Sequence, residues 1–242
     1  MQHWQSILQR DAEEWGISLD AVQMDRFDRY LTLLLDWNTR INLTAIKQPE
    51  EVAVRHFADS LTLLSSLDIP EGGRLIDVGT GAGFPGVPAK IMRPDIDLTL
   101  LDSLQKRLNF LGELLHALGL DARRLHARAE EGGRSAGLRE QFDVATARAV
   151  AALPALCEYC LPFVKVGGRF IALKGRDGAQ EAAAAAHAMQ LLGGTTGAPL
   201  AVTLPAAAGE EPMERLLLPI DKTAHTPTAY PRQGTKITKK PL

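Results

Sequence analysis

The sequence predicts an α/β protein: a sheet of mainly parallel strands with helices on both faces, preceded by a small helical region at the N-terminus. Three observations lead to this prediction. From residue 74 onward, short apolar segments typical of strands alternate with segments of helical periodicity. A glycine-rich loop directly follows the first of those strands, at residues 79–86. By contrast, residues 6–66 have helical periodicity and no strand pattern.

The N-terminal region predicts two amphipathic helices. The first has apolar residues at helical spacing, widened by neighbouring aromatic and leucine side chains: Phe27, Tyr30, Leu31, Leu33, Leu34, Trp37 and Ile41. The second runs over 50–67, after a proline suited to a helix start. A turn with proline and two glycines follows at 68–73. We therefore expect a helical region at 1–70 and a second domain at 71–242.

The second domain alternates between strands and helices. Strands are expected at 74–78, 97–101, 122–126, 142–146 and 169–173, with helices at 85–92, 104–118, 153–163 and 180–192. This alternation predicts a parallel sheet with helices on both faces. Two late strands, at 199–204 and 214–220, have no helical pattern between them, so we expect them to form an antiparallel pair at one edge.

Composition excludes several classes of protein. The chain has 242 residues, of which 45% are hydrophobic and 23% charged, which is ordinary for a globular domain. No apolar run approaches the roughly 20 residues that a membrane span requires. The start of the chain carries acids and lacks the apolar core of a signal peptide. Two cysteines cannot form a disulfide framework, so we expect a cytoplasmic protein.

Charge is distributed unevenly. Residues 1–70 contain six basic and eleven acidic residues, a net charge of −5, and the rest of the chain has a net charge of +3. The last 21 residues have no acid and five bases: Lys222, Arg232, Lys236, Lys239 and Lys240. A basic end of this kind is typical of polyanion binding, and equally of a solvated tail.

The glycine loop fits two cofactor patterns. Spacing at 81, 83 and 86 fits the dinucleotide fingerprint, and Asp77-x-Gly79-x-Gly81-x-Gly83 fits methyltransferases that use S-adenosyl-L-methionine. The dinucleotide pattern begins at the strand end, which here is Gly79, and its third glycine would then fall on Phe84. This register favours S-adenosylmethionine and a Rossmann-like sheet of the class I methyltransferase type.

Three residues around the loop favour the same cofactor. Pro85 removes an N–H that a pyrophosphate would use, and S-adenosylmethionine has no phosphate. Asp77 suits the cationic ammonium, and Asp102, at the end of the next strand, can bind both ribose hydroxyls. The alternative is that Asp77 caps the turn and Asp102 caps the following helix at Leu104.

The chain resembles the bacterial small-subunit ribosomal RNA guanine-N7 methyltransferases, also called the glucose-inhibited division protein B family. The resemblance rests on segments that occur in the same order: 37–46 with Trp-Asn and Asn-Leu-Thr, 56–61 with His-Phe-Ala-Asp-Ser-Leu, the loop 77–86, 101–111, 128–131, 148–149, 173–175 and 230–232. The alanine-rich stretch 182–208 departs from the family pattern.

The resemblance implies the cofactor, the substrate and most of the site. It implies S-adenosylmethionine contacts from Gly79, Phe84, Asp102, Ala129, Glu130 and Arg148. It implies that Arg128, Arg148 and Lys174 line the RNA side of the pocket and position the substrate. The family acts on one guanine of 16S ribosomal RNA in the small ribosomal subunit. We expect a monomer with no metal and no membrane partner.

Guanine N7 chemistry agrees with the residues after the fourth strand. N7 already has a lone pair, so attack on the methyl group needs positioning and no general base. The motif of exocyclic-amine methyltransferases is replaced here by Ala147-Arg148-Ala149-Val150. Cys157 and Cys160 lie inside a helical pattern, where they are expected to be core residues and not zinc ligands or nucleophiles.

The residues alone leave two roles open for the arginines. Arg148 can hold a phosphate, the guanine O6 edge or the cofactor's neighbourhood, or it can form a salt bridge with Asp143 or another nearby acid. Arg128 lies in an arginine-rich run suited to RNA, but five acids between 121 and 143 favour a solvated face.

The predicted strands and helices indicate roles for Lys174, His56 and Asp59. Lys174 follows a buried strand and should emerge at the carboxyl edge of the sheet, where ligands bind. His56 and Asp59 are three residues apart on a helix, where capping or an interhelical hydrogen bond is the favoured role.

Other classes of protein remain open from the residues alone. A methyltransferase acting on a small molecule or protein would share the loop. A nicotinamide-dependent oxidoreductase would need a Tyr-x-x-x-Lys pair after the fourth strand, which is absent. A non-catalytic RNA-binding module could retain the loop without turnover.

Overall fold

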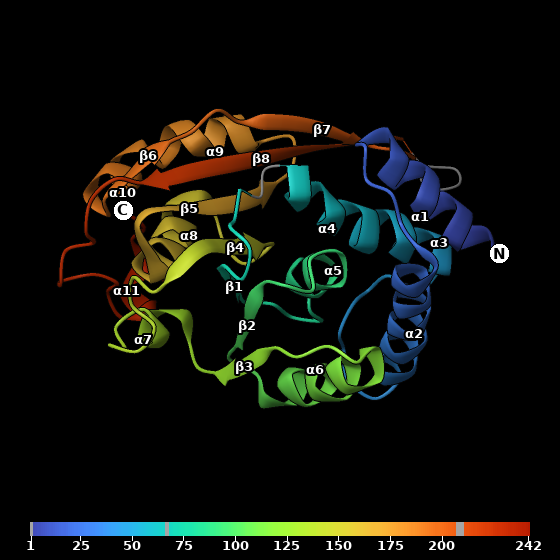
Figure 1. Cartoon of the computed structure of the whole chain (residues 1–242). Helices are drawn as coiled ribbons and strands as arrows, with labels where there is room; N and C mark the ends of the chain where they lie inside the picture. Colours follow the sequence, from blue (N-terminus) through green and yellow to red (C-terminus); the bar gives the residue numbers. More distant parts are fainter. Residues whose placement is uncertain (1, 66–67, 207–210) are drawn as a thin grey trace.

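A mixed sheet is the centre of the computed structural model, which describes residues 2–65, 68–206 and 211–242 (Figure 1). The strands are β1 (Arg74–Val78), β2 (Asp97–Asp102), β3 (Arg123–His126), β4 (Phe142–Arg148), β5 (Val164–Lys174), β6 (Gly194–Thr196), β7 (Leu200–Leu204) and β8 (Met213–Lys222). Their order is β3-β2-β1-β4-β5-β8-β6, and β7 also pairs with β8. The strands β1 to β5 are parallel and β8 is antiparallel to β5, β6 and β7. The predicted α/β fold and the antiparallel pairing of the late strands are confirmed.

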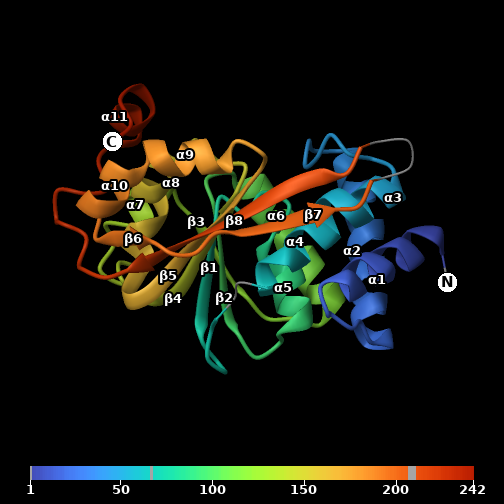
Figure 2. The same ribbon diagram turned by 90° about the horizontal axis from the view of Figure 1, so that it is seen from above.

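Helices cover both faces of this sheet (Figure 2). They are α1 (His3–Glu14), α2 (Ala21–Asn38), α3 (Pro49–Val52), α4 (Asp59–Leu61), α5 (Gly86–Met92), α6 (Gln105–Leu118), α7 (Ala129–Gly132), α8 (Leu153–Cys160), α9 (Gly178–Ala184), α10 (Ala186–Leu191) and α11 (Gly234–Lys239). The strands alternate between the two layers: Leu75 and Leu100 pack with α1, α2, α5 and α6, whereas Ile76 and Leu101 pack with α8 and α10. This alternation follows from the two-residue period of a strand.

The N-terminal helices share a hydrophobic core with one face of the sheet. Helix α2 packs along α6, where Arg26 Nε donates to Leu118 O at 3.1 Å and Trp37 Nε1 donates to a Glu113 carboxylate oxygen at 3.0 Å. The α2 side chain Tyr30 reaches the glycine loop, and its hydroxyl donates to Ala82 O at 2.5 Å. The division into units 1–70 and 71–242 stays a prediction.

The predicted helix over 50–67 is confirmed as helical over 50–65, but it is not a single α-helix. After α3, residues Ala53–Ala58 form a π-helix, followed by α4 and a 3-10 turn at Thr62–Ser65. The Asp59 N–H bonds to Val54 O, five residues back. Apolar periodicity cannot distinguish such a wide turn from an α-helix, and π turns often occur at functional sites. The predicted end of this helix, residues 66–67, lies outside the described residues.

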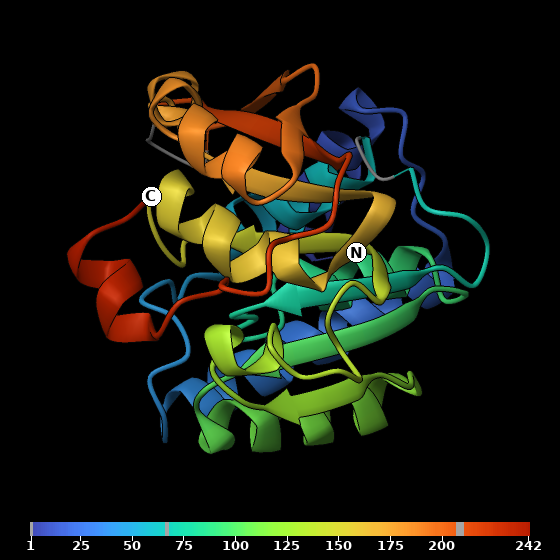
Figure 3. The ribbon, with the colours of Figure 1, turned by 90° about the vertical axis from the view of Figure 1, so that its left-hand side faces the viewer.

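The C-terminal segment differs most from expectation. Lys222 is buried, and its Nζ donates to Leu161 O at 2.9 Å and to the Thr226 hydroxyl, so it is not part of a solvated basic tail. Burial lowers the pKa of Lys222 to about 8. The chain then continues to α11, which lies beside α8 (Figure 3). Periodicity did not predict α7, α11 or β6, because each spans only one or two turns or three residues.

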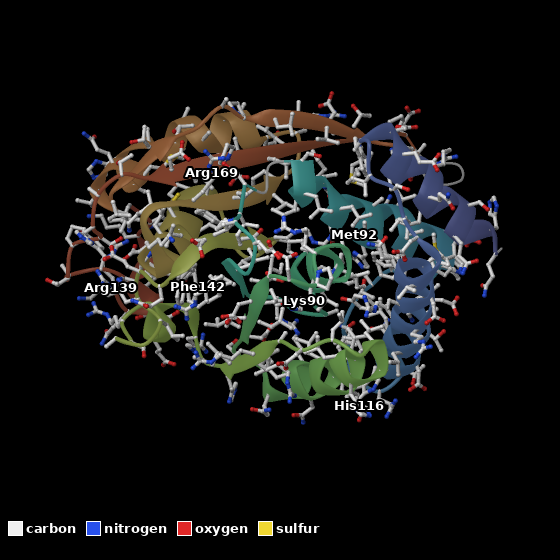
Figure 4. All side chains as sticks on the ribbon, viewed as in Figure 1. Lys90, Met92, His116, Arg139, Phe142 and Arg169 are labelled. Atoms are coloured by element: carbon white, nitrogen blue, oxygen red, sulfur yellow. The ribbon has the colours of Figure 1, made fainter. Side chains whose placement is uncertain are left out.

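Side chains fasten this C-terminal segment to the body of the protein. Arg139, labelled in Figure 4, donates to Thr226 O at 2.6 Å and to Tyr230 O at 2.9 Å. Arg232 forms a bidentate pair with the fully buried carboxylate of Glu158, with one contact of 2.6 Å. The segment is therefore an ordered part of the molecule as far as α11.

Candidate cofactor and RNA site

The loop between β1 and α5 needs its glycines. Gly79, Gly81 and Gly83 have φ values of 73°, 60° and 98°, a region that other residues rarely adopt. The Gly79 N–H donates to Leu101 O at 2.8 Å, and the Gly81 N–H donates to the Asp102 carboxylate at 3.0 Å. The loop is thereby held against the carboxyl ends of β1 and β2, where ligands bind in open α/β sheets.

Asp77 supports this loop from beneath. Its carboxylate is fully buried, and Oδ2 accepts hydrogen bonds from the Thr80 hydroxyl at 2.7 Å and the Gly86 N–H at 2.9 Å. Its Oδ1 has no partner in the part of the chain that the structure describes. Burial raises the pKa of Asp77 to about 6. Asp77 thus takes the turn-capping role that the sequence left open, and its contact with the cofactor ammonium stays a prediction.

Asp102 joins three elements at the end of β2. Its Oδ1 accepts from the Leu104 N–H at 2.8 Å, and its Oδ2 accepts from Gly81 and from Arg107 Nη1 at 3.3 Å. The capping role at Leu104 is therefore present. Asp102 also lines a cavity at the carboxyl edge of the sheet, and its contact with the ribose hydroxyls stays a prediction.

This cavity has a volume of about 1240 Å³. Predicted site residues that line it are Gly79, Asp102, Arg128, Ala129 and Glu130. The turn 149–152 after β4, Tyr159 of α8 and residues of the C-terminal segment 233–241 complete the lining. Sites for one small ligand are usually about 300–1,000 Å³, so this cavity has room for a cofactor together with a nucleotide of the substrate.

The remaining predicted residues do not line the cavity. They are Asp77, Gly81, Gly83, Phe84, Arg148 and Lys174. Phe84 is almost fully buried and stacks on Tyr30 with ring centroids 5.1 Å apart and on His56 at 4.7 Å. Its predicted contact with the cofactor stays a prediction. In the structure, Phe84 joins the loop to α2 and to the π-helical segment.

Arg148 ends β4 in a charged cluster. Its Nη1 contacts Asp59 Oδ2 at 2.8 Å, and Arg215 of β8 contacts Asp59 Oδ1 at 2.6 Å. Asp59 is 1% exposed, so two guanidinium groups neutralise one buried carboxylate. The alternative of a salt bridge from Arg148 to an acid is therefore confirmed, but the acid is Asp59. Asp143 instead binds Lys165 at the other end of β4.

His56 is the neutral member of the same cluster. The Thr44 hydroxyl lies 2.7 Å from its Nε2, and the Arg55 carbonyl lies 3.0 Å from its Nδ1. Burial, with a contribution from the positive charge of Arg148, lowers the pKa of His56 to about 4. The sequence-based expectation of capping or an interhelical hydrogen bond is wrong for both residues, because His56 bonds to Thr44 in a loop and Asp59 pairs with arginines from two strands.

Arg128 lines the cavity, whereas Lys174 does not. Arg128 is exposed at the rim, at the start of α7. Lys174, at the end of β5, donates to Ala151 O at 2.8 Å and pairs with Glu181 at 2.7 Å. Lys174 emerges at the carboxyl edge as expected, and its contact with RNA stays a prediction.

Both cysteines lie on α8 and are fully buried in the core, as expected. Burial raises the pKa of the Cys157 thiol to about 12, which makes it a poor nucleophile. Among residues 2–65, 68–206 and 211–242, no three side chains gather as a metal site. No helix within those ranges is long and apolar enough to span a membrane.

Sequence reasoning missed several residues at the site. Arg215 and Glu181 come from a strand and a helix with no motif, and only the folded chain brings them to Asp59 and Lys174. Tyr159 and the segment 233–241 also line the cavity unpredicted. For the segment 233–241, the one signal in the sequence was the resemblance of the neighbouring Tyr230–Arg232 to the family pattern.

Solved structures of low sequence identity share the fold. A precorrin-6y C5,15-methyltransferase from Geobacter metallireducens has a TM-score of 0.53 and 15% identity, over 75% of this chain and 91% of that one. A 16S rRNA (adenine(1408)-N(1))-methyltransferase mutant from Catenulisporales acidiphilia also has a TM-score of 0.53, with 13% identity over 64% and 87% of the two chains.

The sheet order, the loop after β1 and the cavity beside it define a class I S-adenosylmethionine-dependent methyltransferase. The model of the family described as rRNA small subunit methyltransferase G matches residues 23–203. Proteins named ribosomal RNA small subunit methyltransferase G are 47% identical in Alkaliphilus metalliredigens, over 98% of both chains, and 45% identical in Lachnoclostridium phytofermentans, over 94% of this chain and 93% of that one. This chain belongs to the rRNA small subunit methyltransferase G family.

Proposed function

We propose that this enzyme transfers a methyl group from S-adenosylmethionine to N7 of a specific guanine in 16S ribosomal RNA. The observation that carries the proposal is the near full-length similarity to proteins named for methylation of small-subunit ribosomal RNA. The assignment of guanine N7 as the methyl acceptor rests on the sequence motifs shared with the family and on the residues that follow β4 at the cavity wall.

The residues around the loop fit the cofactor. A Cβ at Gly79 would lie 2.8 Å from Val150 Cγ2, so a side chain there would displace Val150, which also lines the cavity. In our proposal, Asp102 holds the ribose hydroxyls, and Ala129 and Glu130 border the adenosine. S-adenosylmethionine supplies a methyl group on a sulfonium, which is already activated for transfer. Asp77, Gly81, Gly83 and Phe84 keep the loop in the required shape.

For methyl transfer to N7, the main task of the protein is to position the guanine next to the methyl group. N7 carries a lone pair in neutral guanine, so no side chain has to remove a proton before attack. Positioning then supplies most of the rate enhancement. We assign the positioning to Arg148, held by Asp59, and to Arg128 at the rim. The cavity volume fits a base that has left its stack or was already unpaired.

The RNA-binding face surrounds the mouth of the cavity. The exposed bases Arg128 and Lys239 line the cavity, and Lys236 and Lys240 are exposed on the same C-terminal segment as Lys239. Lys222 and Arg232 do not belong to this surface, because Lys222 forms an ion pair with Glu140 and Arg232 forms one with Glu158. Phosphate contacts by the remaining bases make RNA binding sensitive to salt. We further propose that the enzyme acts in the cytoplasm as a monomer.

The test is transfer of a labelled methyl group to small ribosomal subunits that lack the modification, followed by location of the label. We expect label on N7 of one guanine in 16S RNA. A parallel reaction with a metabolite extract and total protein tests the alternative, a small-molecule or protein acceptor. Label on any other atom, or only in the parallel reaction, would refute the proposal.

A further inference from the structure

The turn between β4 and α8, residues 149–152, has a backbone that must be held in place. Ala149 has a φ of 56°, in the left-handed region that a residue with a Cβ rarely adopts. All four residues of the turn line the cavity, and Val150 packs over Gly79 of the cofactor loop. A turn in this conformation persists only where its surroundings fix it.

Lys174 and Glu181 fix the exit of this turn. Lys174 Nζ donates to Ala151 O at 2.8 Å. Glu181 Oε2 accepts the Leu153 N–H at 2.8 Å and lies 2.7 Å from Lys174 Nζ. The lysine thus holds a carbonyl before α8, and the glutamate holds an N–H at the first residue of α8. That N–H has no partner within the helix, and a carboxylate is favourable at a helix N-terminus.

The sequence brings Glu181 into reach through α9. The helix begins at Gly178, where a Cβ would lie 3.0 Å from the Lys174 Cβ, so α9 can start directly beside the end of β5. Glu181 follows one turn later. Side-chain exposures of 10% for Lys174 and 31% for Glu181 place the pair partly out of water, and both of its ends also bind backbone.

We propose that Glu181 and Lys174 are positioning residues for methyl transfer, which act by holding the turn 149–152 at the cavity wall. This inference rests on the proposed function. It differs from the role that the family resemblance implies for Lys174, which is contact with RNA. The two roles predict opposite effects of Glu181. If Glu181 holds the turn, it increases the rate of methyl transfer. If Lys174 instead binds an RNA phosphate, Glu181 weakens RNA binding, because it neutralises the lysine.

The experiment compares Glu181→Ala, Lys174→Met and their double variant. Glu214→Ala is the matched control, because Glu214 pairs at 3.6 Å with Arg176, two residues beyond Lys174, and both are well exposed. We expect kcat to fall about 10-fold or more in each single variant and the double variant to be no worse than the worse single. RNA affinity and its salt dependence should stay unchanged. Glu181→Gln, which keeps an acceptor oxygen for Leu153, should recover part of the rate.

A second readout does not depend on the substrate. Hydrogen exchange at the Leu153 amide should be faster in Glu181→Ala than in the parent or in Glu214→Ala. Unchanged exchange and unchanged kcat in Glu181→Ala would overturn the inference. So would tighter RNA binding in Glu181→Ala together with a salt slope lowered by about one in Lys174→Met, which indicates a phosphate contact. If the parent enzyme methylates no RNA, the proposed function fails, and the exchange rates still decide whether the pair holds the turn.

Discussion

Asp59 is the residue on which the charges behind the cavity converge. It accepts from Arg148 and Arg215, which come from β4 and β8, while it lies itself at the end of the π-helical segment. A buried carboxylate between two guanidinium groups is favourable only as a complete set, because removing one member leaves an uncompensated buried charge. The orientation of Arg148 therefore depends on residue 59.

We predict that Asp59→Asn lowers the free energy of unfolding by about 3–5 kcal/mol and reduces methyl transfer through the displaced Arg148. The control is Asp36→Asn, which removes an exposed pair with Arg40 on α2. It should cost less than about 1 kcal/mol. Urea denaturation of both variants measures the difference. Equal losses in the two variants would show that the buried cluster contributes no more than a surface pair.

Asp77 gives a prediction for pH dependence. Its folded-state pKa of about 6 is above the usual 3.8, so the folded protein binds more protons than the unfolded chain between these values. The stability contributed by the protonated carboxyl is present below pH 3.8 and is lost as pH rises through 6. Asp77→Asn removes the titrating carboxyl, so the variant does not lose this stability as pH rises.

The stability of Asp77→Asn relative to the parent should therefore increase from pH 4 to pH 7, by about 3 kcal/mol at most. His56 titrates in the opposite sense: its lowered pKa makes the protein less stable as pH falls from 6.5 to 4. Because both proteins retain His56, its effect cancels in the comparison. Denaturation curves across this range provide the measurement. A difference independent of pH would contradict a raised pKa at Asp77.

At the scale of elements, the loop after β1 depends on close approach as well as on glycine φ values. Gly79→Ala places a Cβ 2.8 Å from Val150, whereas Gly72→Ala has a similar φ, 68°, with open space around it. Both variants should lose similar backbone stability, about 1–2 kcal/mol, because Ala adopts a positive φ only with strain. Only Gly79→Ala should also weaken S-adenosylmethionine binding, which calorimetry measures. Equal affinities in the two variants would show that the packing of Val150 on Gly79 does not shape the site.

Elements with strong local signals could be predicted, and those fixed by distant contacts could not. The strands β1 and β2, helix α6 and the glycine loop follow from periodicity and turn chemistry in single stretches of sequence. The π-helical turn at Ala53–Ala58 has the same apolar spacing as an α-helix. Lys222 resembles a surface base in sequence, and its burial is explained by partners that the fold brings to it: two carbonyls, the Thr226 hydroxyl and the Glu140 carboxylate.

The residues of the candidate site also fall into two groups, those predicted from local sequence and those that only distant contacts bring to the site. Gly79, Asp102, Arg128, Ala129 and Glu130 line the cavity, as expected of a loop and two strand ends in one parallel sheet. Sequence distance hides the rest: Arg215 lies 156 residues from Asp59, and no local pattern links them. Residues that act by holding others in place are therefore the hardest to predict from sequence.

At the scale of the whole molecule, the two ends of the chain enclose the sheet from opposite faces. The N-terminal helices share one core with β1 and β2, and the C-terminal segment runs along α8 to the cavity. At the mouth, Gly234 approaches Glu130 so closely that a Cβ would lie 2.1 Å from a carboxylate oxygen. Anchoring by Arg232 fixes where this closing segment begins.

A chain that ends at Arg232 would keep this anchor and lose the cavity wall formed by α11. We predict that it binds S-adenosylmethionine about 10-fold more weakly, equivalent to about 1.4 kcal/mol, while the loss of buried Ile237 costs only about 1.5–3 kcal/mol of stability. The control replaces Lys236, Lys239 and Lys240 by Gln in the full chain, which keeps the wall and removes its charge. Both proteins should have a smaller salt slope of RNA binding, by up to about three, but only the truncated chain should lose cofactor affinity. Calorimetry and RNA titrations at several salt concentrations separate the two effects, and an unchanged cofactor affinity in the truncated chain would contradict a role for α11 in the wall.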